Sequence, residues 1–319
     1  MTDQIKKDIV EFIMLVGIPA SGKSTLVEQY RSVGYAVISS DAIREEQTDG
    51  LCMDGLSDQE RGQINRQVFE AVRRKTQEHL KKGNSVVVDA TNLSRKNRMG
   101  FLKQLPKIAC KRKCVLVLTP VEVCLERNRQ RVGNARVPEE AMYRMLCNFE
   151  CPNHWEGWDE IIPMAATTAY RFPFESSENF SQDNPHHSRT LGEHMLQVEA
   201  YCTEHGQEEL RRAARYHDIG KLYTKRFENT RGEKTKIAHY YGHENYGAYL
   251  FLTEMCCGKE INASEFDRVL YDANLINCHM RPLTRWAYIE NAEKKDRLLF
   301  GDPFVEDLIL LHQADRSAH

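Results

Sequence analysis

Three features are missing from the sequence, and each absence excludes a class of protein. The first ten residues, MTDQIKKDIV, contain two acids and no uninterrupted apolar stretch, so they do not resemble a secretion signal. No segment approaches the roughly 20 consecutive apolar residues of a membrane-spanning helix. The ten cysteines include no Cys-x-x-Cys pair, which favours free thiols over a disulfide framework. We therefore expect a cytoplasmic protein that does not bind membranes.

The charge of the chain is small overall but unevenly distributed. The formal net charge is -2, yet residues 1–150 hold 25 Lys and Arg against 19 Asp and Glu, whereas the remainder holds 19 against 27. A basic half suits a polyanion such as nucleic acid, and an acidic half suits cations. Because 319 residues exceed the usual size of a single hydrophobic core, we expect two domains.

A phosphate-binding sequence follows the first apolar run. Residues 10–16 predict a buried strand, and the residues after Lys23 predict a helix. Between them, residues 17–24 fit G-x-x-x-x-G-K-[ST], in which backbone N–H groups and a helix N-terminus hold nucleotide phosphates. This pattern predicts ATP or another nucleoside triphosphate with Mg²⁺, Lys23 reaching the β- and γ-phosphates and Ser24 the metal. The residues predicted to bind the nucleotide or its Mg²⁺ are Gly17, Ser21, Gly22, Lys23, Ser24, Thr25, Asp89 and Arg131.

Further apolar runs alternate with helical stretches after this loop. They predict strands at residues 35–39, 85–90, 114–120 and 159–165. Alternation of strands and helices predicts an α/β domain with a parallel sheet, in which active residues lie at the carboxyl ends of the strands.

Two charged residues follow the second predicted strand at the edge where phosphates would bind. Asp41 comes directly after the strand, and Arg44 lies one helical turn later on the same side. This spacing would place a general base beside an anion clamp. The alternative is that Asp41 caps the helix that follows, which is a favoured use of aspartate.

Other charged residues predict the metal site and a lid. Asp89 ends the third strand, as a magnesium-binding carboxylate should, and is followed by Ala90 rather than by the glutamate of water-activating ATPases. Transfer to a hydroxyl is therefore favoured over hydrolysis. Arg127 and Arg131 lie four residues apart on a predicted helix that breaks at Gly133, an arrangement that suggests a lid over the phosphates.

The segments GIPASGKST, SDAIR, VVVDATN, ERNRQR and NHWEGWDEI together resemble the phage-type and bacterial polynucleotide kinases, over about residues 9–168. The resemblance implies that Asp41 deprotonates a 5'-hydroxyl and that Arg44 grips the adjacent nucleic-acid phosphate. It also implies that Arg131, supported by Arg127, holds the donor phosphates. The Asp41-x-x-Arg44 pair best distinguishes polynucleotide kinases from small-molecule P-loop kinases, because the latter share the other motifs.

The second half predicts a different kind of domain. Residues 169–185 mix proline, serine, asparagine and acids without a period, so we predict a linker there, between a P-loop kinase domain of residues 1–168 and a domain of residues 186–319. In the latter, apolar residues recur at spacings of three and four, which predicts an all-α domain. Six residues along it follow the order of the HD phosphohydrolase signature, which this part of the chain resembles. They are His194, His217, Asp218, His243, His279 and Asp315.

Mixed imidazole and carboxylate donors suit Mn²⁺, Ni²⁺, Co²⁺, Fe²⁺ or Zn²⁺, and a carboxylate such as Asp218 bridges two ions where one imidazole cannot. We therefore predict a two-metal site, with Lys221 as the cation that positions a substrate phosphate. For His243 and His279 the alternative is a packing or capping role. Other histidines fit no position of the signature, among them His186, His187, His239, His312 and His319, and we expect them to have surface or supporting roles rather than to bind metal.

The two halves together predict an enzyme that heals nucleic-acid ends. A 5'-kinase paired with metal-dependent phosphoester hydrolysis points to RNA or DNA ends carrying a 5'-hydroxyl and a 3'-phosphate or 2',3'-cyclic phosphate, prepared for a separate ligase. Bacterial fusions of HD and polynucleotide kinase modules, which the chain resembles in reversed order, imply the same role. One alternative is a nucleoside or other small-molecule kinase fused to an HD nucleotidase, and another is a nucleotide-sensing regulator.

Overall fold

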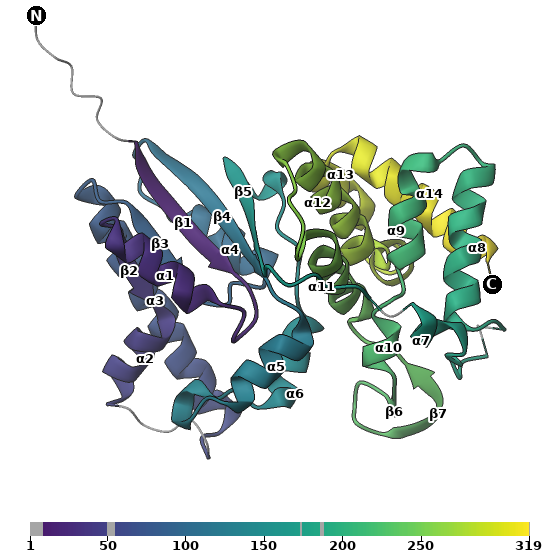
Figure 1. Cartoon of the computed structure of the whole chain (residues 1–319), viewed down its shortest axis with the longest axis horizontal. Helices are drawn as coiled ribbons and strands as arrows, with labels where there is room; N and C mark the ends of the chain where they lie inside the picture. The colour runs from purple at the N-terminus through teal and green to yellow at the C-terminus, as the bar shows by residue number, and fades with distance from the viewer. Residues whose placement is uncertain (1–8, 50–54, 173, 186–187, 319) are drawn as a thin grey trace, which may run out of the picture. The chain divides into compact units, whose positions relative to one another are not determined.

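The computed structural model describes residues 9–49, 55–172, 174–185 and 188–318. The chain divides into two compact units. The first extends to Glu139 and also contains Glu156–Met164, and the second contains Glu140–Trp155 and the chain from Ala165 onward (Figure 1). Residues 140–155 therefore pack in the second unit, although the elements before and after them belong to the first.

The first unit is built on a five-stranded sheet in the order β2-β3-β1-β4-β5. The pairs β2–β3, β3–β1 and β1–β4 are parallel. All five predicted strands are present, but β4 begins at Cys110 rather than Cys114, because its first residues, CKRK, are mostly basic and carry no apolar signal. The strands are β1 (Val10–Val16), β2 (Ala36–Ser39), β3 (Val86–Asp89), β4 (Cys110–Leu118) and β5 (Glu160–Ala165).

Helices cover both faces of this sheet. On one face, Leu26 of α1 (Lys23–Ser32) packs into the apolar cluster formed by the strands. On the other, Phe12 of β1 stacks on Phe101 of α4 (Arg95–Leu102), with ring centroids 5.6 Å apart. Burial on both faces explains why β1 is continuously apolar rather than alternating. The other α-helices wholly within this unit are α2 (Ser40–Thr48), α3 (Asp58–Lys81) and α5 (Val121–Arg129).

The second unit is mainly helical, which confirms the predicted fold class of an α/β P-loop domain followed by a helical domain. Its buried centre is α11 (His243–Cys256), in which ten residues are buried. Among the residues that the structure describes, no helix combines the length and the apolar character that crossing a bilayer requires. The longer helices from residue 191 onward are α8 (Leu191–Glu204), α9 (Arg211–Tyr216), α11 (His243–Cys256), α12 (Ala263–Cys278), α13 (Ala292–Phe300) and α14 (Asp302–Ser317).

Two parts of the second unit differ from the predicted pattern. Strands β6 (Arg226–Glu228) and β7 (Lys234–His239) form an antiparallel hairpin, which the all-helical prediction missed because most of its side chains are exposed and polar. The segment predicted as a linker is folded and contains α7 (Glu175–Glu178). It packs through single aromatic side chains, such as Phe174 against Tyr216 at 4.9 Å, and such contacts leave no periodic signal in the sequence.

Buried asparagine amides fasten residues 140–155 to the helices of the second unit. Asn277 of α12 accepts a hydrogen bond from the Cys151 N–H at 3.1 Å. Its amide nitrogen donates to the Phe149 carbonyl at 3.0 Å and to Asn245 Oδ1 at 2.8 Å. One side chain therefore satisfies three polar groups away from water, and an apolar replacement would leave them without this partner.

We expect Asn277→Ala to lower the free energy of unfolding of the second unit by about 2–4 kcal/mol, because three buried hydrogen bonds are lost together. Urea denaturation followed by circular dichroism measures this loss. The exposed Asn179, at the end of α7, provides the matched control, since Asn179→Ala should change stability by less than about 0.5 kcal/mol. Equal stability of the two variants would contradict the assignment.

Candidate functional site

Residues 17–24 form a loop from the end of β1 to the start of α1. Gly22 has a φ of 105°, in the region that disfavours side chains. A Cβ at Gly17 would lie 2.8 Å from the Val117 carbonyl oxygen, so this position also requires glycine. Because the first N–H groups of a helix lack intrahelical acceptors, the start of α1 offers donors to an anion. Ser24 and Thr25 are exposed there.

Lys23 lies in the centre of this loop and is buried. Its ammonium group donates to the carbonyls of Gly17 at 3.0 Å and Ile18 at 2.8 Å. Burial lowers the pKa of Lys23 to about 8, although the charges of Asp89 and Asp41 act in the opposite direction. Asp41 and Asp89 therefore lie within electrostatic range of Lys23, although 66 positions separate Lys23 from Asp89.

Asp89 lies at the end of β3, beside β1. Burial raises the pKa of its carboxyl group, Lys23 and Arg131 lower it, and Asp41 raises it further. The structure thus brings four of the predicted residues, Lys23, Asp41, Asp89 and Arg131, within electrostatic reach of one another. A carboxylate beside a lysine at a helix N-terminus is a suitable ligand for Mg²⁺ that accompanies nucleotide phosphates.

Asp41 lies in the first turn of α2 but does not cap it. The N-cap is Ser39, whose hydroxyl accepts from the Ala42 N–H at 3.4 Å, so the capping alternative for Asp41 is not what the structure shows. The Asp41 side chain is 88% exposed, and its Oδ1 accepts a hydrogen bond from Arg44 Nη1 at 2.6 Å. Arg44 also donates to Asn65 of α3 at 3.4 Å. An exposed carboxylate held by an arginine is available to a substrate hydroxyl.

The predicted lid arginines lie near the loop and are held by main-chain carbonyls. Arg127 donates to the Ala20 carbonyl at 3.4 Å, and Arg131 to the Ala135 carbonyl at 3.4 Å. The segment that carries Arg131 is closed by the buried Asn128, which pairs with Val137 through both amide atoms, at 2.6 and 3.0 Å. Asn128 was not among the predicted residues. Its position between the two predicted lid arginines in ERNRQR could have indicated that it belongs to the same segment.

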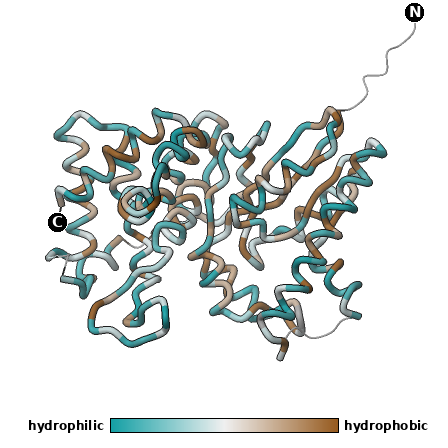
Figure 2. Tube along the Cα trace, turned by 180° about the vertical axis from the view of Figure 1, so that it is seen from behind, coloured by the Kyte–Doolittle hydropathy of each residue, from teal (hydrophilic) through white to brown (hydrophobic). Residues whose placement is uncertain are grey.

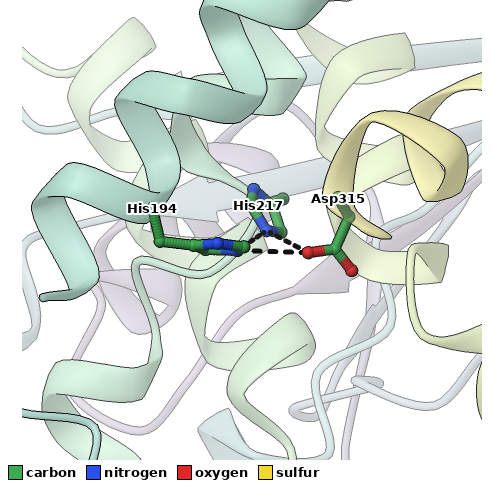
Figure 3. A group of neighbouring side chains, drawn as sticks. All are labelled: His194, His217 and Asp315. Carbon is green, nitrogen blue, oxygen red and sulfur yellow. Dashed lines mark hydrogen bonds and ion pairs between the residues drawn. The ribbon is translucent and has the colours of Figure 1, made fainter. Parts of the chain in front are cut away.

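In the second unit, the six predicted metal ligands lie in two groups of three. Figure 3 shows the first group, whose side chains point toward one another from three separate segments. Within each group the ligand atoms lie within 4.8 Å of one another. The groups are His194 of α8, His217 after α9 and Asp315 of α14, and then Asp218 after α9, His243 at the start of α11 and His279 at the end of α12.

Asp218 belongs to the second group but also contacts the first. Its Oδ1 lies 3.1 Å from His243 Nε2 and 3.6 Å from His279 Nε2. Its Oδ2 lies 3.4 Å from the Nε2 atoms of both His194 and His217. Each oxygen therefore faces a different pair of imidazoles, and this is the position of a bridging carboxylate.

The hydrogen bonds of the imidazoles fit a metal site. His217, His243 and His279 each place Nδ1 2.7 Å from a main-chain carbonyl oxygen. A proton on Nδ1 leaves Nε2 with a lone pair that faces the cluster. The Nε2 atoms meet closely, at 3.3 Å between His194 and His217 and at 3.2 Å between His243 and His279. Convergent lone pairs favour a cation between them.

The charge of this cluster leads to the same conclusion. Burial alone lowers the pKa of His217, but Asp218 and Asp315 outweigh it and raise that pKa to about 10. The same surroundings hold the pKa of both carboxyl groups well below the usual range, against the effect of burial. In the second group burial lowers the pKa of His279, but around His217 the cluster favours positive charge. Divalent transition metals with imidazole and carboxylate ligands would supply it.

Lys221 lies beside the cluster and is buried. Its Nζ is 2.7 Å from Asp218 Oδ2 and donates to Gln182 Oε1 at 2.9 Å. The Tyr240 hydroxyl donates to the Gln182 carbonyl at 2.5 Å, which fixes the backbone of Gln182 there. Gln182 lies in the predicted linker and was missed, since nothing in the local pattern distinguishes it. Contact of Lys221 with a substrate phosphate remains a prediction.

The remaining histidines were predicted to have other roles. His239 and His312 belong to neither group of metal ligands among the described residues. His186, His187 and His319 lie outside the residues that the structure describes.

Two family models match parts of the chain, each less than half of it. A family model described as an AAA domain matches residues 12–152, and one described as an HD domain matches residues 191–318. The bifunctional polynucleotide phosphatase/kinase of Schizosaccharomyces pombe is 26% identical over 160 residues. This match covers 49% of the chain and 34% of that protein, so the chain spans about a third of the length of its curated relative.

Solved structures resemble part of the chain at low identity. A sugar kinase from Janibacter sp. HTCC2649 is 16% identical, with a TM-score of 0.38, over 48% of this chain and 85% of that one. A chain of the Pnkp1/Rnl/Hen1 RNA repair complex is 20% identical, with a TM-score of 0.38, over 46% of each chain. At these values the likeness does not distinguish one substrate from another.

Proposed function

Because the chain joins an N-terminal P-loop kinase domain to a C-terminal HD domain, we propose that it is a bifunctional enzyme that heals nucleic-acid ends. The first domain would phosphorylate a 5'-hydroxyl with ATP and Mg²⁺. The second would hydrolyse a 2',3'-cyclic or terminal phosphate at the 3' end of RNA or DNA, which a separate ligase would then join. The name of the Schizosaccharomyces pombe relative likewise pairs a phosphatase with a kinase.

The 2.6 Å pair of Asp41 and Arg44 is the observation that carries the kinase proposal. A carboxylate in this place would accept the proton of a 5'-hydroxyl as the bond to the γ-phosphorus forms. The guanidinium of Arg44 has five N–H donors, and the two hydrogen bonds to Asp41 and Asn65 leave others for a phosphate. A polynucleotide has a phosphate next to its terminal nucleoside, whereas a free nucleoside has none.

The hydrolase proposal rests mainly on Asp218, whose carboxylate contacts both groups of candidate metal ligands. His194, His217 and Asp315 would hold one ion, His243 and His279 the other, and Asp218 both. Bound metal lowers the pKa of water and so supplies a nucleophile near neutral pH. Main-chain carbonyls at Nδ1 orient His217, His243 and His279, and Lys221 would attract the substrate phosphate.

The competing proposal is a small-molecule kinase fused to an HD nucleotidase. The two are separated by one assay of the full chain with ATP, comparing a 5'-hydroxyl oligonucleotide with the matching free nucleoside. We expect the oligonucleotide to be the better phosphate acceptor. If the oligonucleotide also ends in a 2',3'-cyclic phosphate, we expect that end to be hydrolysed when Mn²⁺ or Ni²⁺ is added. A preference for the nucleoside would contradict the polynucleotide kinase proposal and support a small-molecule kinase.

Arg44→Ala is expected to raise the KM for the oligonucleotide acceptor by about 10-fold or more, because one charged hydrogen-bonding partner of the substrate phosphate is lost. The KM for ATP should change little. Arg44→Lys keeps the charge without the planar fork and should recover only part of the loss. Steady-state kinetics with both acceptors measure these effects. Equal loss for the oligonucleotide and the nucleoside would contradict the role of Arg44.

A further inference from the structure

The segment of residues 225–241, here called the basic hairpin, contains β6, β7 and their flanking residues. It holds five basic residues and two acidic ones within a half of the chain that is acidic overall. In Figure 1 the hairpin extends beyond α10 (Lys221–Thr224), away from the other helices of its unit. It is therefore a basic projection on an acidic domain.

Most of the charges on the basic hairpin are not used within the fold. Arg226, Arg231, Lys234 and Lys236 are exposed, and none of them forms an ion pair with another residue that the structure describes. On the helices of the same unit, by contrast, several arginines are paired with carboxylates. Examples are Arg211, Arg212, Arg215, Arg268, Arg281 and Arg297. Cations without internal partners are available to an external polyanion.

Aromatic side chains accompany these charges. Phe227 of β6 is 45% exposed and Tyr241, just after β7, is 38% exposed. The Tyr241 ring stacks on His239, with centroids 5.3 Å apart. Exposed aromatic faces beside basic groups are the combination that holds single-stranded nucleic acid, because every base has a face that stacks while the backbone phosphates attract the cations.

The base of the hairpin is joined to the metal cluster. The Ala238 N–H donates to the Asp183 carbonyl at 2.9 Å, and Lys225 pairs with the Asp183 carboxylate at 2.7 Å. The adjacent residue, Gln182, accepts from Lys221, which contacts Asp218. On the other side, the Tyr240 carbonyl oxygen lies 2.7 Å from Nδ1 of His243. The residue before β6 and the end of β7 therefore both lead, within a few residues, to groups at the candidate hydrolase site.

From these observations we infer that the basic hairpin binds the backbone of a single strand whose 3' end lies at the metal cluster. The inference rests on the proposed function and makes it more specific: the hydrolase acts on the end of a polynucleotide rather than on a free nucleotide. Lysines on an exposed strand also discourage pairing with another sheet, and this alone would account for Lys234 and Lys236. The two explanations differ in one expectation: only strand binding by the hairpin makes these lysines lower the KM for an oligonucleotide without lowering the KM for a mononucleotide.

The test compares the wild-type full chain with the charge-reversed variant K234E/K236E. Each is supplied with Mn²⁺ and with two substrates, an oligonucleotide of about 20 residues that ends in a 2',3'-cyclic phosphate and a 2',3'-cyclic mononucleotide. We expect the KM for the oligonucleotide to rise about 10-fold or more, while the KM for the mononucleotide stays within about twofold. The salt dependence of the oligonucleotide KM should also weaken, since each lost phosphate contact removes about 0.7 from the logarithmic slope.

The control variant, K294E/K295E, reverses two exposed lysines of α13 in the same domain and should leave both KM values near those of wild type. Phe227→Ala should also raise the oligonucleotide KM alone. An unchanged oligonucleotide KM in K234E/K236E, or an equal rise for both substrates, would overturn the inference while leaving the proposed hydrolase in place. A wild-type chain that hydrolyses neither substrate would instead remove the proposed function.

Discussion

Asp218→Ala should remove most of the transition metal from the purified chain and lower the rate of phosphoester hydrolysis by about 10³-fold or more. The reason is the double contact of this carboxylate, whose two oxygens face the imidazoles of separate ligand groups. Losing a shared ligand weakens both sites together. Elemental analysis of the full chain gives the metal content, and release of phosphate or opening of a cyclic end gives the rate.

His279→Ala provides the comparison for this prediction, because His279 contributes to the second group alone. We expect it to keep about one ion and measurable hydrolysis. Circular dichroism on the same preparations checks that the helical second unit of each variant is folded. If Asp218→Ala retained as much metal as wild type, the bridging assignment would be wrong, and if His279→Ala lost all metal, the two groups would not be separable.

Lys23→Ala should lower the rate of 5'-phosphorylation by about 10³-fold and leave hydrolysis at the HD site near the wild-type value. The ammonium group is buried in the loop at the start of α1, where burial lowers its pKa to about 8. Nucleotide phosphates would replace the carbonyl partners of Lys23, and stabilisation of their charge by one fixed donor is worth roughly 10²- to 10³-fold. Lys23→Met removes the charge but keeps most of the volume, so it separates chemistry from packing.

Asp41→Ala tests the acceptor side of the same site. Loss of a general base should cost about 10²- to 10⁴-fold in turnover, with hydrolysis again unaffected. Because Asp41 is exposed and does not cap α2, the variant should unfold at the wild-type temperature. Turnover near wild type would reject Asp41 as the base, and loss of both activities in either variant would reject the assignment of the two reactions to separate sites.

The first domain was largely predictable because its signals are local. A strand buried on both faces is apolar throughout, as VEFIMLV is, and the loop after it needs glycine at positions whose backbone or neighbours exclude a side chain. The prediction was incomplete where side chains are polar but still pair in the sheet, as at the start of β4, and in the β6–β7 hairpin.

The residues of the second site were predictable as a set but not as a geometry. His194 and Asp315 are far apart in the chain and meet at 3.1 Å only because α8 and α14 pack together. Gln182 and Asn277 could not be recognised from the sequence, because an amide is distinguished by its partners. Two partners of Asn277, Phe149 and Cys151, lie in residues that were predicted to belong to the first domain, and Gln182 itself lies in a predicted linker.

The sequence by itself determined the class of each domain, the phosphate loop and the candidate metal ligands, since these depend on residue type and order along the chain. Only the tertiary structure decided that Asp218 turns one oxygen to each pair of imidazoles. It also decided that Ser39 rather than Asp41 caps α2, and that residues 140–155 fold with the second unit. These features depend on distances between atoms far apart in the chain, and packing sets those distances where spacing along the chain does not.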